Sequence, residues 1–303
     1  MTIGISTFSF VNGIINRNSD VQRSLQEAQM QLATGLKSID YKGIATNTQR
    51  LLDLESDMSR LSSQNENAML IKNRINRQNQ SLSTMLDVLT AFRTDLTKAF
   101  GGGSLVTPQD LQIITQSHQE NFAAALNTEM GGRFLFSGTA QNVQPVDLTD
   151  PAIIPQVSPT LPDTAYYQGN TEPMRVQIAD EVTVNMSVPA NSSGFEKTLR
   201  AMNLIINDPN TDAARQEARD LVNEAIDEIT AIRTRVSSNA RIVEDQMFDN
   251  DTELALLTEI TSGFKHVDIA EATLRSQTIS AQLQASFAIT TRALGLSLTN
   301  FLN

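Results

Sequence analysis

The chain has 303 residues, a formal net charge of −11, 40% hydrophobic residues and no Cys. The acidic balance disfavours a nucleic-acid partner, because phosphate binding requires a basic face. The absence of Cys excludes disulfides and thiolate metal sites, and no run of apolar residues is long enough to predict a membrane span.

Residues 1–50 are expected to form an N-terminal assembly helix followed by a loop. Their first thirty positions lack a basic segment followed by an apolar one, so we expect no cleavable secretory signal. Gly35 predicts the end of the helix, and residues 40–47 are typical of a loop. The apolar residues proposed for assembly lie on one helical stripe: Ile14, Val21, Leu25 and Leu32.

Residues 51–132 are expected to form the first half of a helical rod. From Leu51 to Phe100, apolar residues recur in alternating steps of three and four for about seven heptads, the pattern of a coiled coil. Neither Pro nor Gly interrupts it. Four positions on this seam are polar, and they either fix the register against a partner or are simply hydrated: Asn65, Lys72, Asn79 and Arg93.

A glycine turn at residues 101–103 precedes a second predicted helix. Thr107, Pro108 and Asp110 provide a capping hydroxyl, a first-turn proline and an acid three residues on. The helix is expected to run to about Met130, where residues 131–132 (Gly-Gly) would end it. Residues 51–132 then form a helical hairpin.

Residues 133–194 are expected to form a small β-rich middle domain. Seven of the nine prolines lie between Pro145 and Pro189. Residues 134–138 are typical of a short strand and turn, and residues 144–163 of a loop. Residues 174–178 and 182–188 alternate apolar and polar side chains around a polar turn, which predicts a β-hairpin.

Residues 195–262 are expected to form the second half of the rod, and residues 263–303 a C-terminal assembly helix. The chain would run out along 51–132, cross the middle domain and return, so the two halves would pair antiparallel. The predicted fold is therefore mainly α, a long antiparallel helical rod or coiled coil with an inserted β-containing domain. The C-terminal stripe proposed for assembly consists of Ile279, Leu283, Phe287, Leu294 and Leu298.

No catalytic or cofactor motif is evident, and we predict that the chain is not an enzyme. His118 and His266 have no metal-ligand neighbour at helical spacing, and no nucleophile elbow or dinucleotide glycine pattern occurs. The acidic residues between Glu244 and Glu253 do not match a calcium loop. They are interpreted as a solvated helix face, with an acidic docking patch as the alternative.

Five short motifs, in order along the chain, resemble the bacterial flagellin family and its hook-associated branch. Residues 32–37 (Leu-Ala-Thr-Gly-Leu-Lys) are similar to the family's N-terminal Leu-Ser-Thr-Gly signature, and residues 268–272 and 294–302 to its C-terminal region. Residues 131–138 (Gly-Gly-Arg-Phe-Leu-Phe-Ser-Gly) and 167–170 (Tyr-Gln-Gly-Asn) resemble the hook-associated branch. The Asn-Asp-Gly run of filament flagellins is absent at residues 65–68, which also favours that branch.

The resemblance implies a structural, extracellular protein of the bacterial flagellum. Such proteins are exported through the flagellar type III apparatus without a cleaved signal, and their terminal helices form the coiled-coil core of a tubular assembly. The implied role is to join hook to filament. The implied partners are further copies of the chain, a hook-associated neighbour, flagellin, the export apparatus and an export chaperone, with no cofactor, nucleic acid or membrane.

Two other classes stay open from the sequence. A short filament flagellin would form helical filaments by itself. A non-flagellar coiled-coil adaptor or chaperone would form a discrete dimer and would bind neither hook nor filament proteins.

Overall fold

The computed structural model describes residues 3–40, 48–99 and 106–302, with side chains for residues 12–40, 48–99 and 106–292. Phe100 and the predicted loops at 41–47 and 101–104 lie outside the described residues. The described helices are α1 (Ile3–Thr34), α2 (Thr48–Ala99), α3 (Pro108–Leu126), α4 (Ser193–Asn207), α5 (Asp212–Lys265) and α6 (Ile269–Leu302). Four short strands accompany them: β1 (Glu129–Met130), β2 (Arg133–Phe134), β3 (Arg175–Gln177) and β4 (Thr183–Asn185). The prediction of a mainly helical chain with a small β-containing region is confirmed.

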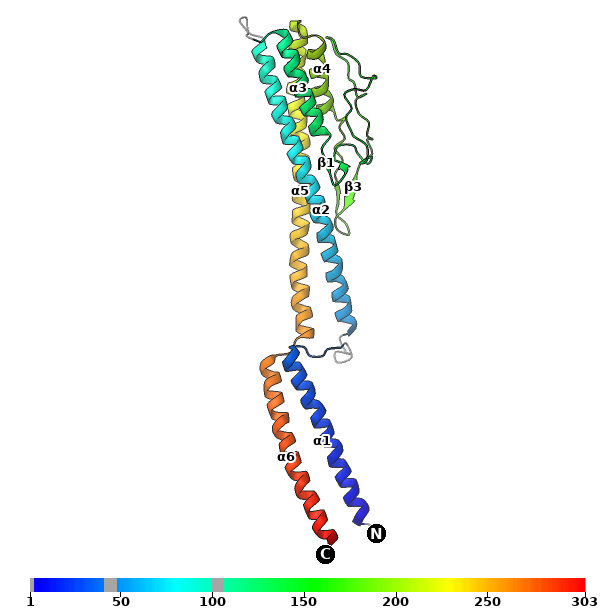
Figure 1. Ribbon diagram of the computed structural model, residues 1–303, viewed down its shortest axis with the longest axis vertical. Helices are drawn as coiled ribbons and strands as arrows, with labels where there is room; N and C mark the ends of the chain where they lie inside the picture. Colours follow the sequence, from blue (N-terminus) through cyan, green and yellow to red (C-terminus); the bar gives the residue numbers. More distant parts are fainter. Residues whose placement is uncertain (1–2, 41–47, 100–105, 303) are drawn as a thin grey trace. The chain divides into compact units, whose positions relative to one another are not determined.

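The contacts within the chain divide it into two units (Figure 1). Unit 1 comprises Met1–Leu61 and Thr252–Asn303, and unit 2 comprises Ser62–Asp251. Helices α2 and α5 each contribute to both units. The domain limits expected from the sequence follow pattern changes rather than contacts, and they stay a prediction.

In unit 2, α2 and α5 run antiparallel and are joined by polar contacts at heptad spacing. The contacts are Asn65 Nδ2 donating to Asp251 Oδ1 at 2.6 Å, the Lys72–Glu244 ion pair at 3.1 Å, and Ser237 Oγ donating to Asn79 Oδ1 at 3.3 Å. Each step of seven residues up α2 is a step of seven down α5. Because a shift of register would break all three pairs together, these contacts favour one alignment.

These polar contacts settle part of what the heptad pattern left open. Three of the four polar seam positions face α5, whereas Arg93 is exposed. The acidic residues of α5 are also partly accounted for, because Glu244 and Asp251 are the partners of Lys72 and Asn65.

The core of unit 2 is centred on phenylalanines from four different segments. Phe92, Phe122, Phe136 and Phe195 are completely buried. The Phe195 ring meets Phe136 edge-on, with centroids 6.1 Å apart, and Phe122 at a tilt, with centroids 6.3 Å apart. Phe195 therefore connects α3 and α4 to the segment that follows β2.

The start of α3 is as expected, but its end is not. Thr107 caps the helix, and its hydroxyl and the Asp110 carboxylate form the predicted reciprocal capping box. The helix stops at Leu126 rather than near Met130, so the predicted end was wrong. Gly131 and Gly132 have φ of +60° and +73° and form the turn of the β1–β2 hairpin. Two successive positive φ angles suit a tight hairpin turn as well as a helix end, and the sequence does not separate them.

The middle segment has less strand than its pattern indicates. The predicted hairpin is present as β3 paired antiparallel with β4. Of residues 133–138 only Arg133 and Phe134 are strand, because Leu135 and Phe136 turn inward and are buried. Their backbone groups form hydrogen bonds outside the strand pairing: Leu135 N donates to Thr128 O at 3.0 Å, and Phe136 O accepts from Ala190 N at 2.8 Å.

Two of the motifs that carry the family resemblance meet in the middle segment. Asn170 Oδ1 accepts a hydrogen bond from Thr139 N at 2.9 Å, and Asn170 N donates to Ser137 O at 3.1 Å. Gly138 has φ of +68°, and a Cβ at this position would lie 2.0 Å from Asn170 O. Only glycine permits this approach of the two segments.

We expect Gly138→Ala to destabilise unit 2 by clearly more than the 1–2 kcal/mol typical of a left-handed backbone alone, because the added carbon collides with backbone. Gly131→Ala is the matched control, since its φ is also positive but nothing lies within 4 Å of its Cβ position. The measurement is denaturant unfolding of both variants. Equal losses would show that the approach to Asn170 does not constrain the fold.

Candidate assembly interface

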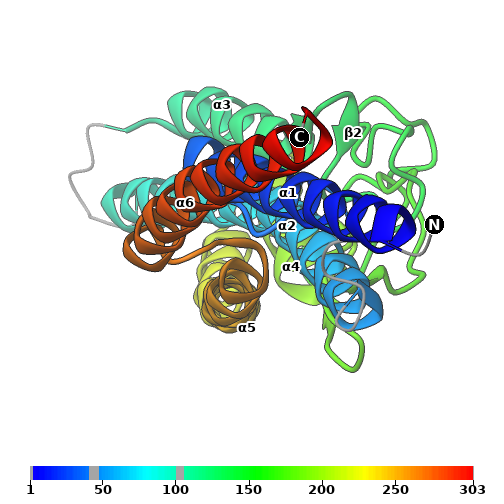
Figure 2. The ribbon, with the colours of Figure 1, turned by 90° about the horizontal axis from the view of Figure 1, so that it is seen from below.

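Helices α1 and α6 of unit 1 lie side by side and antiparallel (Figure 1), as the view from below also shows (Figure 2). At one end Leu36 pairs with His266 in an antiparallel bridge. Further along, Asn18 Nδ2 donates to Thr290 Oγ1 at 3.3 Å, and Ser286 Oγ donates to Asn18 Oδ1. Residues nearer the N-terminus in α1 therefore lie beside residues nearer the C-terminus in α6.

Backbone bonds fix where this helix pair starts. Gly35 ends α1 with φ of +70°, a conformation that glycine adopts without strain. Lys37 N then donates to Lys265 O at 2.8 Å, and Val267 N donates to Gly35 O at 3.0 Å. The Lys37 ammonium also donates to Gly263 O at 2.7 Å. The end of α1 and the start of α6 are thus held together in one hydrogen-bonded junction.

Most of the residues predicted for assembly lie partly buried in this pair. Leu294 and Leu298 belong to α6, but their side chains lie outside the described residues, and Phe287 is 44% exposed. The half-buried members are Ile14, Val21, Leu25, Leu32, Ile279 and Leu283.

The fully buried positions of the pair are small or polar, and none of them is among the large apolar residues predicted for assembly. Among the described side chains of α1 and α6, only Asn18, Ala28 and Ala272 are buried. Spacing was the available signal, because position 18 completes the heptad series between Ile14 and Val21. A pattern based on hydrophobicity alone places such an asparagine on the surface.

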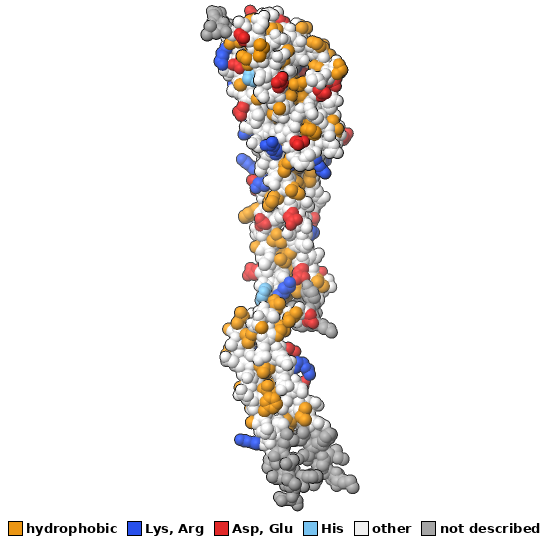
Figure 3. All heavy atoms as spheres, in the orientation of Figure 1, with side chains coloured by type: hydrophobic (Ala, Val, Ile, Leu, Met, Phe, Trp, Pro, Cys, Tyr) orange, Lys and Arg blue, Asp and Glu red, His pale blue; other side chains and the backbone are white. Residues whose placement is uncertain are grey.

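This helix pair leaves much of its apolar surface uncovered. No large apolar side chain described in α1 or α6 is fully buried. The residues at least 44% exposed are Ile15, Ile269, Leu274, Phe287 and Ile289. Hydrophobic side chains are visible on the part of Figure 3 that these helices occupy. Because isolated helices depend on packing for stability, such surfaces mark association sites.

A solved structure has a similar fold over most of the chain. A protein of Vibrio parahaemolyticus described as a flagellar hook-associated protein matches with a TM-score of 0.60 and 16% identity, covering 72% of this chain and 97% of that one. The chain has the fold of that flagellar hook-associated protein. The resemblance predicted from the sequence is thus confirmed at the level of the fold.

Two further solved structures show weaker similarity. Bacillus cereus FlgL is 13% identical with a TM-score of 0.46, over 73% of this chain and 99% of that one. Xanthomonas campestris FlgL is 12% identical with a TM-score of 0.42, over 75% and 99%. No protein-family model and no curated protein matches the chain.

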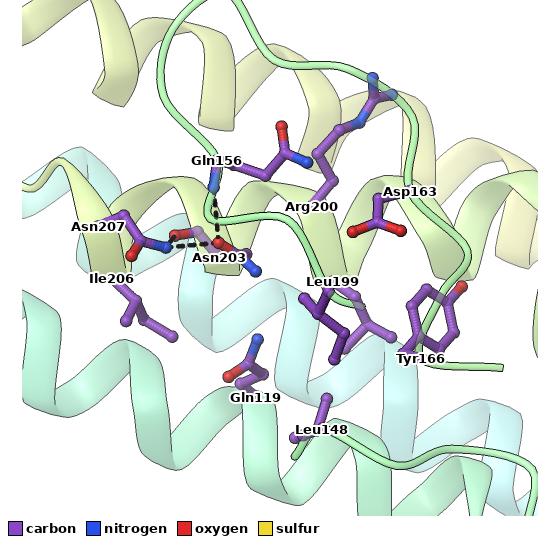
Figure 4. A pocket seen from close by; sticks show the side chains of 11 residues that line it. Gln119, Leu148, Gln156, Asp163, Tyr166, Leu199, Arg200, Asn203, Ile206 and Asn207 are labelled. Carbon is purple, nitrogen blue, oxygen red and sulfur yellow. Dashed lines mark hydrogen bonds between the residues drawn. The ribbon is translucent and has the colours of Figure 1, made fainter. Parts of the chain in front are cut away.

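A cavity of about 100 Å³ in unit 2 is the main candidate for a small-molecule site (Figure 4). Its polar lining residues are largely engaged in holding the loop at residues 154–166. Three acceptors on α4 and α5 bind backbone N–H groups of this loop: Asn203 binds Gln156 at 3.0 Å, Glu217 binds Thr160 at 2.7 Å, and Glu196 binds Asp163 at 3.0 Å. The cavity is best understood as part of this anchorage.

Burial in this anchorage raises the pKa of two side chains. Burial raises the pKa of the Glu196 carboxyl, against the opposing hydrogen bond from Asp163 N and the charge of Arg200 3.2 Å away. Burial, with the charges of Glu196 and Asp163, also raises the pKa of Tyr166, whose hydroxyl donates to Ala190 O. Both neutral forms are therefore favoured in the folded chain.

Glu196 should give unit 2 a measurable pH dependence. Its folded pKa is raised, so the folded chain holds a proton that the unfolded chain releases above the ordinary glutamate pKa of about 4.3. Its contribution to the free energy of unfolding then falls as pH rises through this window. We subtract the free energy of unfolding of the Glu196→Gln variant from that of the wild type. We expect this difference to fall as pH rises from about 4 towards neutrality. A flat or rising difference would contradict the raised pKa.

The two histidines have different neighbours. His118 Nε2 lies 3.1 Å from Asp95 Oδ2 and packs near Phe92, while His266 Nδ1 contacts the Ser262 hydroxyl at 2.9 Å. In the part of the chain that the structure describes, no cluster of three metal-ligating side chains is present. Over the same residues, no helix has the length and apolar character to span a membrane.

Proposed function

We propose that the chain is a structural subunit of the bacterial flagellum that joins hook to filament. It would do so by packing α1 and α6 against the corresponding helices of neighbouring subunits in a tube. The observation that carries the proposal is a helix pair with exposed apolar surface, in a chain that has the fold of a flagellar hook-associated protein. A role in mechanical connection, rather than catalysis, is part of the proposal.

The register of the pair supports seam packing. The contact between Asn18 and Ser286 places Val21 at the level of Leu283, and Leu25 at the level of Ile279. Apolar residues predicted from the two ends of the chain thus come to matching heights. Their exposed neighbours on the outer faces are then available for other subunits, which would bury surface that one chain leaves in water.

The proposed partners are further copies of this chain, a hook-associated neighbour on one side and flagellin on the other. Export would use the flagellar type III apparatus, with an export chaperone as an additional partner. The protein would act outside the cell, in the flagellum. The family resemblance of residues 131–138 and 167–170 supports the junction role over that of a filament subunit.

Electron microscopy of flagella from a strain lacking this protein tests the proposal. We expect hooks without filaments, with flagellin released into the medium and both phenotypes reversed by supplying the gene. Normal filaments in the deletion strain would overturn the junction role. Filaments formed by the purified protein alone would instead identify a filament flagellin.

A further inference from the structure

An open groove follows the surface of α5 in unit 2 between two arginines. The residues that line it are Thr230, Arg233, Thr234, Ser237, Ser238 and Arg241. No acidic residue occurs between Ile229 and Val243. Within the described residues, Arg233 and Arg241 form neither an ion pair nor a side-chain hydrogen bond. The groove is thus a basic, hydroxyl-rich surface on an acidic protein.

An acidic and aromatic band follows directly on the same side of the helix. Asp245 lies one turn beyond Arg241, and Phe248 and Asp249 lie one turn beyond Asp245, so the positions form a continuous stripe. Phe248 is 71% exposed. Asp245 and Asp249 take part in no ion pair among the residues that the structure describes. The stripe therefore carries opposite charges in two adjacent blocks.

We propose that two copies of this chain dock through this stripe in antiparallel orientation, about a two-fold axis that crosses the stripe at the height of the buried Val243. Arg241 of each copy then faces Asp245 of the other, Ser238 faces Asp249, and Phe248 covers the groove beside Ser237. Like the pairs in other two-fold contacts, each of these occurs twice. The second copy is the occupant that this charge pattern fits.

Orientation follows from the order of the two blocks. Their centres, near residues 237 and 247, are about 15 Å apart along the helix. Two parallel copies in register would place arginine on arginine and aspartate on aspartate, which is repulsive. Reversing one copy brings both opposite-charge contacts together at once. The neutral hydroxyl side chains of the groove also allow an aromatic ring to approach without burying an unpaired charge.

This dimer is a state separate from the proposed flagellar assembly. In a tube that joins hook to filament all subunits point the same way, so an antiparallel pair cannot be part of it. The dimer depends only on α5 of unit 2, and it can be present or absent whichever function the chain has.

Sedimentation velocity over a concentration series tests the charge pairing. We expect Arg241→Asp or Asp245→Arg to raise the dimer dissociation constant at least about tenfold, because each places two like charges together twice. The double variant R241D/D245R restores opposite charges and should return to within about threefold of wild type. Higher salt should weaken the wild-type dimer.

Arg235→Asp is the matched control, because Arg235 is exposed on the same helix but does not line the groove. Circular dichroism confirms that each variant is folded. A wild-type protein that stays monomeric throughout, single variants that behave like Arg235→Asp, or a double variant no better than the singles would each overturn the proposal.

Cross-linking distinguishes the orientation, since the chain contains no Cys. Ile242→Cys lies beside the two-fold axis and should link to its own counterpart through a short bismaleimide. Thr234→Cys should not, because its two copies would lie about 27 Å apart along the helices. Linking at both positions, at Thr234 alone or at neither would overturn the antiparallel dimer.

Discussion

Phe195→Ala is expected to lower the free energy of unfolding of the chain by about 3–5 kcal/mol. The Phe195 ring is fully buried and contacts the rings of both Phe122 and Phe136. Its loss leaves a cavity where α4 meets α3 and the segment after β2. These segments are separate in the chain and cannot easily close a gap of that size, so both the transfer and the cavity contributions are lost.

Chemical denaturation followed by near-ultraviolet circular dichroism measures this effect. Tyr166 and Tyr167 lie in unit 2, and Tyr166 is buried, so their signal reports on the tertiary packing of that unit. Phe195→Leu is the matched control and should lose less, because it keeps much of the buried volume. Similar losses for the two variants, or a loss below about 1 kcal/mol for Ala, would contradict a central role for this ring.

Local periodicity explains why the long helices were predictable. A seam that repeats every seven residues specifies one helix face, and α2 and α5 bury that face. Even the polar seam residues Asn65, Lys72 and Asn79 could be identified before their partners were known. Arg93 fits the same repeat and is nonetheless exposed, although its level in the register still lies within α5, because spacing gives a position on a helix but not which side chains cover it.

The middle segment was less predictable because its stability comes from contacts distant in sequence. Nothing local shows that Phe136 packs on Phe195, or that Gly138 lies against Asn170. The sequence predicts a helix end at Gly131–Gly132, whereas the pair forms a hairpin turn. A single sequence identifies such residues as breaks or motifs, and only the folded contacts show what they join.

For α1 and α6, the sequence predicted the helices but not the character of their contact. The prediction favoured large apolar residues, whereas the closest contact uses Ala28, Ala272 and Asn18. Small residues let two helices approach closely, and the larger ones then flank the contact and stay half-exposed. This division matters for function, since side chains that flank a two-helix contact can also meet a third helix.

Leu25→Asp is expected to prevent assembly while leaving unit 2 folded. Leu25 is half-buried in α1, and its own pair covers only part of it. A carboxylate there would have to lose its hydration whenever a neighbouring subunit packs on the seam, without a basic partner on the α1 stripe. Because the same cost recurs in every copy of a tube, a modest penalty in one chain becomes a large one for the assembly.

Assembly and folding are measured separately, and only assembly should fail. Flagella of the variant strain should end at the hook, with flagellin in the medium and the variant protein still exported. The tyrosine signal of unit 2 should unfold within about 0.5 kcal/mol of wild type, since Leu25 belongs to unit 1. Gln26→Asp adds the same charge at an exposed neighbouring position and should assemble normally. Normal filaments with Leu25→Asp, or failure of both variants alike, would mean that this seam does not carry the contact between subunits.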